Sequence, residues 1–217
     1  MYFNYSEKAK KHKLYYLGKY TAKFLSVFSY KKLIVKGKEN IPLDGPLIVA
    51  SNHIAFSDPA IIVANCPRTV HFMAKSELFD NPFKSAFMRN MNAFPVKRNH
   101  FDRTSLRYAM EILKNGWILG IFPEGRRVRK TSPTEPKNGI AYLAKITGAD
   151  ILPTCIYRSP DDDAAWHNLV LVYGKVIKNS ELDFNGDSKS EKLVKASEMI
   201  MKRINELWEH ENESKSG

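Results

Sequence analysis

Short, unbroken apolar runs are the feature that most constrains the fold of this chain. Two of them, residues 47–50 and 117–122, lead directly into polar residues, and each has the length of a strand that is buried on both faces. Segments with helical spacing of apolar residues lie between such runs. Apolar strands that alternate with helices predict an α/β fold with a central, mostly parallel or mixed sheet covered by helices. Further strands are expected at residues 33–35, 70–74, 94–96, 151–156 and 169–177.

The chain divides into three expected parts. Its 217 residues are enough to bury one α/β core, which we expect over residues 33–180 as a single domain. Residues 1–32 are expected to form an amphipathic helical hairpin, and residues 181–217 a helix packed on the core. Ser188 and Glu191 form a capping box that marks the start of this last helix.

The N-terminal part combines an apolar stripe with basic side chains. A helix of this kind suits the plane of a bilayer interface, with lysines against anionic head groups, although it can equally pack on the core of its own domain. No stretch reaches the roughly 18–20 apolar residues of a membrane span. Lys19 and Lys23 interrupt what would be the apolar region of a signal peptide. We therefore expect a peripheral, monotopic protein at the cytoplasmic face of the cell membrane. The stripe consists of Leu14, Leu17, Thr21, Phe24, Leu25 and Phe28.

The charge of the chain predicts an anionic partner. The formal net charge is +11, which suits a membrane surface, a nucleic acid, a phosphorylated metabolite or an acidic carrier protein. No recognised nucleic-acid-binding motif accompanies it. Cys66 and Cys155 are isolated in apolar surroundings, which predicts two reduced, buried thiols. No closely spaced histidine pair indicates a metal site, and none is expected.

The run at residues 47–50 leads to a candidate catalytic pair. His53 follows the expected strand, and Asp58 stands before Pro59, where it is expected to be a helix N-cap. On one continuous helix the two side chains would diverge by roughly 140°, so a turn must bring them together. A carboxylate that holds one imidazole nitrogen leaves the other free to act as a general base. The alternative is that Asp58 only caps a helix and His53 is an ordinary residue.

A second candidate loop follows the strand at residues 117–122. It contains Glu124, Arg126 and Arg127. Because ligands gather at the carboxyl ends of parallel strands, this loop and His53 are expected to face one cleft. Arg126 and Arg127, with Arg98 from another loop, could grip a phosphate, but the same arginines would also suit an ordinary basic surface.

Several catalytic and nucleotide-binding motifs are absent from the sequence, which restricts the types of reaction that we expect. The sequence has no GxSxG elbow, no nucleotide-binding glycine motif and no HExxH. A base without a nucleophile of its own suggests that the substrate supplies one, namely a hydroxyl that His53 deprotonates and that attacks an activated acyl carbon.

Two motifs together carry a family resemblance. NHIAFSD at residues 52–58 matches the pattern NHxxxxD, and FPEGRR at residues 122–127 closely matches FPEGTR. In this order they resemble the glycerolipid acyltransferase family that includes the 1-acyl-glycerol-3-phosphate acyltransferases. The resemblance spans roughly residues 36–175. It implies transfer of a fatty acyl group from acyl-coenzyme A or acyl carrier protein to a hydroxyl of a glycerophosphate lipid, without a cofactor.

The resemblance also implies roles for single residues. His53 would be the base, Asp58 its orienting carboxylate, and Arg98 and Arg127 phosphate ligands. Glu124 and Gly125 would belong to the acceptor site, and Asn52 and Lys137 are candidate supporting residues. The chain departs from the family pattern at Arg126, where threonine is usual, at Val128, where serine is common, and at Lys97, where the second motif often has an acidic residue. These changes bear on which acceptor head group is preferred.

The expected function is that of an interfacial lysophosphatidate acyltransferase in phospholipid biosynthesis. A related reading changes the acceptor to glycerol 3-phosphate or another lysophospholipid. A second class is a non-catalytic basic module that binds lipid or nucleic acid. A third is a hydrolase, which would release fatty acid without an acceptor.

Overall fold

The computed structural model describes residues 15–21, 32–97, 102–128, 135–158, 168–184 and 188–216. Within these ranges, seven strands form one sheet in the order β1-β7-β6-β2-β5-β3-β4. All neighbouring strands are parallel except β6 and β7. The mostly parallel, mixed sheet predicted from the sequence is thus confirmed. The strands are β1 (Lys32–Lys36), β2 (Leu47–Ser51), β3 (Val70–Lys75), β4 (Ala93–Val96), β5 (Ile118–Ile121), β6 (Asp150–Arg158) and β7 (Asn168–Tyr173).

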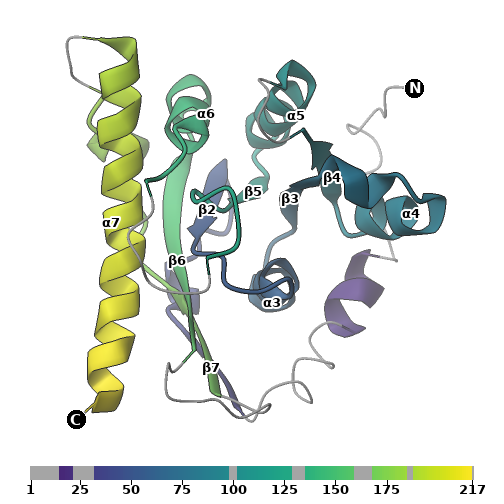
Figure 1. Cartoon of the computed structure of the whole chain (residues 1–217). Helices are drawn as coiled ribbons and strands as arrows, with labels where there is room; N and C mark the ends of the chain where they lie inside the picture. The colour runs from purple at the N-terminus through teal and green to yellow at the C-terminus, as the bar shows by residue number, and fades with distance from the viewer. Residues whose placement is uncertain are drawn as a thin grey trace.

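Helices cover both faces of the sheet (Figure 1). Val49 of β2 packs in one apolar cluster with Ile62 of α3, whereas its neighbour Ile48 packs in another with Ile112 of α5 and Ile200 of α7. Successive side chains of a strand point to opposite faces, so β2 is buried from both sides, as its apolar run predicts. Apart from a helical segment at residues 15–21, the helices of the described residues are η1 (Lys38–Asn40), α3 (Asp58–Asn65), η2 (Ser76–Phe79), α4 (Pro82–Asn90), α5 (Arg103–Lys114), α6 (Gly139–Thr147), η3 (Asn179–Glu181) and α7 (Lys189–Ser216).

A local sequence signal sets the start of the last helix, whereas the end of the last strand differs from the prediction. Ser188 Oγ accepts the Glu191 N–H at 3.1 Å at the start of α7, where the capping box is predicted. The strand expected at residues 169–177 is wrong in its extent. β7 ends at Tyr173, and after this break in the ladder Ile177 forms an isolated antiparallel bridge with Ile151 of β6.

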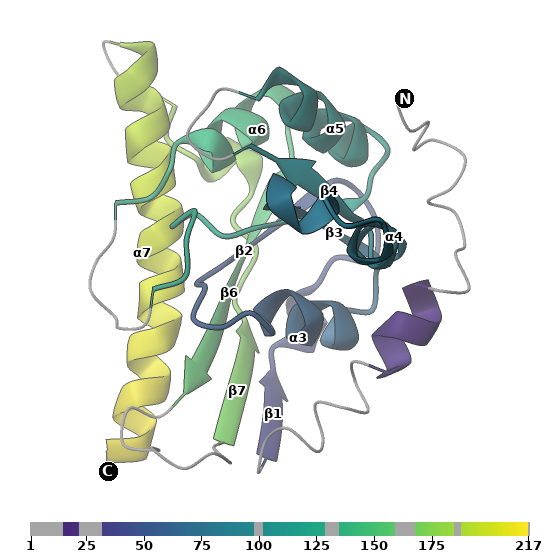
Figure 2. The same cartoon turned by 45° about the vertical axis from the view of Figure 1, so that its right-hand side comes forward.

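Helix α7 packs along β6, so the C-terminal part lies on the core (Figure 2). Two of its own side chains, Ile200 and Ile204, are fully buried. Near its end, the buried carboxylate of Glu211 pairs with Lys36 of β1 at 2.7 Å. This ion pair ties the last turns of α7 to the far edge strand of the sheet.

Of the expected N-terminal hairpin, the structure describes residues 15–21, which are helical. The remainder of the hairpin lies outside the described residues. Tyr15 is buried and its hydroxyl accepts the backbone N–H of Val70 at 3.1 Å, while Lys19 donates to the carbonyl of Cys66. The described part of the expected stripe, including Leu17, is instead exposed. Across the described ranges, no helix is both long and apolar enough to cross a bilayer.

Candidate active site

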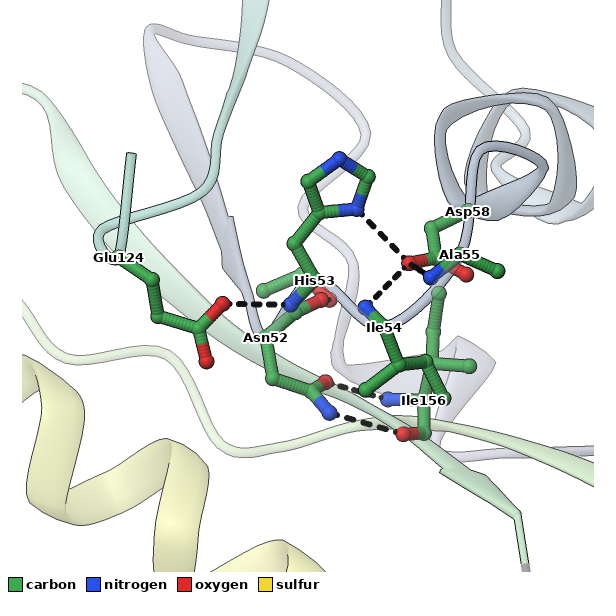
Figure 3. A network of polar contacts seen from close by, with 8 residues as sticks. Asn52, His53, Ile54, Ala55, Asp58, Glu124 and Ile156 are labelled. Atoms are coloured by element: carbon green, nitrogen blue, oxygen red, sulfur yellow. Dashed lines mark hydrogen bonds and ion pairs between the residues drawn. The ribbon is translucent and has the colours of Figure 1, made fainter. Parts of the chain in front are cut away.

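The loop between β2 and α3 wraps around one carboxylate oxygen (Figure 3). Asp58 Oδ2 lies 2.8 Å from His53 Nδ1. The same oxygen accepts the backbone N–H groups of Ile54 and Ala55, each at 2.7 Å. Asp58 is fully buried. The strand end, the turn and the helix start therefore bring His53 and Asp58 together, as predicted.

The expected N-cap role of Asp58 is wrong by one position. Ser57 is the N-cap of α3, and Asp58 is the first helical residue, followed by Pro59. Its carboxylate turns back to the preceding loop. The backbone N–H groups of that loop would otherwise be unsatisfied, and a buried donor without a partner is costly.

The geometry fixes the tautomer and the plane of the imidazole. Because Asp58 Oδ2 already accepts two backbone N–H groups, its contact with His53 is best satisfied by an Nδ1–H donor. In Figure 3 the other ring nitrogen points away from Asp58. The Phe122 ring stacks on the imidazole, with centroids 4.1 Å apart and planes 17° apart. His53 is thus held at one nitrogen and on one face, which leaves Nε2 as the nitrogen that can take up a proton.

Glu124 joins the second loop to the backbone of His53. Its Oε2 accepts the His53 N–H at 2.9 Å, and the His53 carbonyl accepts the Val128 N–H at 2.7 Å. Burial raises the pKa of Glu124 to about 7, and the charge of Asp58 adds to the rise, against the His53 N–H and Arg126, which lower it. The two predicted loops therefore meet at His53, where the Glu124 carboxylate accepts the backbone N–H.

Asn52 extends the sheet beyond the end of β2. Its side-chain oxygen accepts the Ile156 N–H at 2.8 Å, and its amide nitrogen donates to the Ile156 carbonyl at 2.9 Å. The amide thus satisfies the backbone N–H and carbonyl of Ile156 in β6, at the point where β2 has ended. Asn52 directly precedes His53, so these two hydrogen bonds also hold the backbone at His53 in place. The contact is of the kind that the expected supporting role of Asn52 requires.

Gly125 allows the second loop to turn back under Lys137. Its φ of +66° is in the left-handed region, and its N–H donates to the Phe122 carbonyl at 3.0 Å. A Cβ added at Gly125 would lie 2.7 Å from Lys137 Cε. The Lys137 N–H donates to the Pro123 carbonyl at 2.8 Å. Lys137 therefore lies against this turn through both its backbone and its side chain.

The candidate phosphate ligands are placed in part. Arg126 and Arg127 follow Gly125 and are exposed. Arg98 lies outside the described residues. Lys97, just before it, is exposed, and its N–H donates to Asp102 Oδ2 at 3.1 Å. Among the residues that the structure describes, no group of three or more His, Cys, Asp or Glu side chains could hold a metal ion.

Comparisons with known proteins identify the family of this chain. Residues 32–157 match the family model described as Acyltransferase. A 1-acyl-sn-glycerol-3-phosphate acyltransferase of Bacillus subtilis is 31% identical over 177 residues, which are 80% of this chain and 86% of the relative. The chain belongs to the acyltransferase family. A second relative in this family, the 1-acyl-sn-glycerol-3-phosphate acyltransferase of Borreliella burgdorferi, is 34% identical over 132 residues, which are 59% of this chain and 52% of the relative.

A solved acyltransferase has the same fold. The crystal structure of the 1-acyl-sn-glycerophosphate (LPA) acyltransferase PlsC from Thermotoga maritima superposes with a TM-score of 0.69 at 28% identity. The match covers 94% of this chain and 83% of that one. The α/β fold predicted from the alternation of apolar strands and helices is therefore confirmed, and the family resemblance carried by the two motifs agrees with it.

Sequence reasoning missed two contacts of this candidate site. Phe122 was expected to be the end of a buried strand, and its stacking on His53 was not anticipated. Val128, noted only as a departure from the family pattern, binds the His53 carbonyl through its backbone. A backbone contact does not depend on the side chain, so no sequence signal could have found it.

Proposed function

We propose that this acyltransferase moves a fatty acyl group from acyl-coenzyme A or acyl carrier protein to the free hydroxyl of 1-acyl-glycerol-3-phosphate, giving phosphatidate. The observation that carries the proposal is the 2.8 Å contact between His53 Nδ1 and Asp58 Oδ2. It is the arrangement of a general base with its orienting carboxylate. The names of the relatives support this choice of acceptor.

The reaction needs no covalent enzyme intermediate. His53 Nε2 takes the proton of the acceptor hydroxyl while the oxygen attacks the thioester carbonyl. The imidazolium that forms keeps its Nδ1–H on Asp58, which stabilises the positive charge. The tetrahedral intermediate then collapses, the carbon–sulfur bond breaks, and the thiolate takes the proton from His53. An ester and a free thiol result, and the base returns to its starting form.

Cationic side chains would bind the acceptor phosphate. Arg126 and Arg127 follow directly on the loop that holds the His53 backbone, and we assign the same role to Arg98 by its motif. Guanidinium groups suit phosphate oxygens because they can donate two parallel hydrogen bonds. Glu124 and Gly125 lie at the base of this loop and would shape the acceptor site. Lys137 would support their turn.

The enzyme would work at the cytoplasmic face of the membrane, as a peripheral protein. The net charge of +11 favours anionic lipids, and it also favours the two acidic donors, coenzyme A thioesters and acyl carrier protein. No nucleic-acid partner and no cofactor are proposed.

The test is the release of free thiol from each donor with lysophosphatidate present. We expect release from at least one donor, and a loss of roughly 10²- to 10⁴-fold in His53→Ala, the range that a general base contributes. His210→Ala is the matched control, because His210 is an exposed histidine on α7. The proposal fails if neither donor reacts or if His53→Ala matches the parent.

Three further assays separate the alternatives. If transfer to glycerol 3-phosphate or to another lysophospholipid is faster than transfer to lysophosphatidate, that molecule is the acceptor instead. Release of fatty acid without any acceptor would favour a hydrolase. Binding to duplex DNA without acyl transfer would favour a non-catalytic basic module.

A further inference from the structure

Helix α4 presents two large apolar rings to solvent. Phe83 and Phe87 are 84% and 63% exposed. They lie four positions apart, so both rings project from one face of the helix. No residue of α4 is buried. Exposed aromatic side chains gathered on one face are typical of a surface that another molecule covers.

The helical segment at residues 15–21 lies beside α4 in both views (Figures 1 and 2). A Cβ on Gly18 would overlap the sulfur of Met91, the residue that follows α4. This segment exposes Leu17 and Tyr20 at 60% and 64%. Two neighbouring elements, far apart in the sequence, therefore both carry exposed apolar side chains.

The charges around these rings favour an anionic surface. Helix α4 contains Lys84 and Arg89 and no carboxylate. The carboxylates nearest to it in the sequence are Glu77 and Asp80, and Glu77 is already paired with Lys75 at 2.8 Å. Exposed aromatic rings flanked by cations are the composition that binds the boundary between head groups and acyl chains of an anionic bilayer.

Helix α4 also starts from the edge of the sheet where the candidate site lies. It follows η2 and the carboxyl end of β3, which is parallel to β5 and thus to β2. His53 follows the carboxyl end of β2 at this same edge. Phe56, in the loop between His53 and Asp58, is 70% exposed. Exposed apolar rings therefore occur both on α4 and in the catalytic loop.

We propose that α4 is a membrane-contact element in addition to the N-terminal segment, and that Phe83 and Phe87 enter the acyl boundary of an anionic bilayer. The inference rests on the proposed function, because an acceptor with a fatty acyl chain resides in a membrane. It assigns a surface that neither the N-terminal stripe nor the two catalytic motifs includes. Lys84 would lie against the anionic head groups beside the two rings.

The experiment measures binding of the full chain to vesicles of phosphatidylglycerol and phosphatidylcholine by co-sedimentation, with no acyl donor present. We expect Phe83→Ser with Phe87→Ser to weaken vesicle binding by at least roughly 10-fold per ring, because each substitution removes a large apolar group from the acyl boundary. Leu43→Ser is the matched control. Leu43 is 85% exposed but lies in the turn before β2, at the opposite edge of the sheet, so binding should stay at the parental level.

A direct readout keeps the test independent of folding and of catalysis. Phe83→Trp should show a blue-shifted emission on vesicle addition, and brominated lipid should quench it. The proposal is overturned if the double variant binds vesicles like the parent, or if the tryptophan stays in water. It is also overturned if the double substitution instead dissociates a dimer of this chain, measured by sedimentation. If the parent binds vesicles through Phe83 and Phe87 but transfers no acyl group, the result counts against the proposed function alone.

Discussion

The carboxylate of Glu124 holds the backbone of His53, because its Oε2 accepts the His53 N–H at 2.9 Å. The two residues belong to loops that follow different strands, β5 and β2, which are direct neighbours in the sheet. The position of the candidate base is therefore set by the second loop as well as by its own. Glu124 is a positioning residue in this geometry, whatever it contributes to acceptor binding.

The raised pKa of Glu124 predicts a specific pH dependence of stability. Its pKa is about 7 in the folded chain and near 4.5 in the unfolded chain, so the folded state binds more protons between these values. This group therefore lowers the free energy of unfolding as the pH rises from about 4.5 through about 7. Glu124→Gln keeps an oxygen for the His53 N–H and removes the titration. Between pH 5 and pH 8, we expect the parent to lose on the order of 1–3 kcal/mol relative to this variant.

Urea denaturation at both pH values checks this. Glu39→Gln, at an exposed carboxylate of η1, is the control and should follow the parent. If the parent and Glu124→Gln change in parallel with pH, then Glu124 does not titrate in this range.

Replacing Asp58 by asparagine separates charge from geometry. Both backbone N–H groups of the loop need an acceptor, so we expect the amide oxygen to take the place of Oδ2. The amide nitrogen then takes the place of Oδ1, for which no described group is a hydrogen-bond partner. The imidazolium formed in the reaction loses its counter-charge. We expect kcat to fall roughly 10²- to 10³-fold, and a buried unpaired amide to cost about 1–3 kcal/mol of stability.

Acyl-transfer kinetics and thermal unfolding measure these two effects. Asp150→Asn is the control, since Asp150 pairs with Lys178 at the start of β6, away from the site. A parental kcat in Asp58→Asn would show that the carboxylate charge does not contribute to the reaction.

Asn52→Ala should affect both stability and catalysis. The substitution removes two hydrogen bonds to Ile156 and leaves a buried N–H and a buried carbonyl of β6 without partners. We expect a loss of about 1–3 kcal/mol in the free energy of unfolding, together with a lower kcat, because His53 is the next residue. Asn115→Ala, which removes an exposed side-chain hydrogen bond at the end of α5, should change neither by a comparable amount. Equal effects of the two substitutions on kcat would contradict the positioning role of Asn52.

The sequence predicted the sheet because β2 and β5 are buried on both faces, which leaves unbroken apolar runs that end where the polar loops begin. The boundary of β7 was missed because Val176 and Ile177 resume the apolar pattern shortly after the strand ends at Tyr173. The regular pairing stops after Tyr173, although the Gly174 N–H still donates to the Pro153 carbonyl of the neighbouring strand β6 at 2.8 Å and Ile177 bridges to Ile151. The apolar pattern does not reveal where this pairing is interrupted.

The candidate site was predictable where its residues are close in sequence. His53 and Asp58 lie on the two sides of one turn, so a strand end and a helix start were enough to pair them. The contact of Glu124 with the His53 N–H joins two loops from separate strands, and the sequence indicated only a shared edge. Phe122 was predicted to be a core residue. An aromatic residue at the end of an apolar run has the same sequence pattern whether its ring packs in the core or on the candidate base His53.

Phe122 provides a last test, because its ring contacts the imidazole without any polar bond. The Phe122 ring lies between His53 and Phe72, with centroid distances of 4.1 and 5.6 Å. Phe122→Leu keeps an apolar side chain but removes the flat surface that fixes the imidazole plane. Stacked rings contribute about 0.5–1.5 kcal/mol beyond burial, so we expect kcat to fall by up to roughly 10-fold with little change in KM. Phe184→Leu is the matched control, since Phe184 is a half-buried ring beside Lys145 of α6. It should lose similar stability in thermal unfolding and keep its kcat, and an equal loss of kcat in both variants would mean that the stacking on His53 has no part in the reaction.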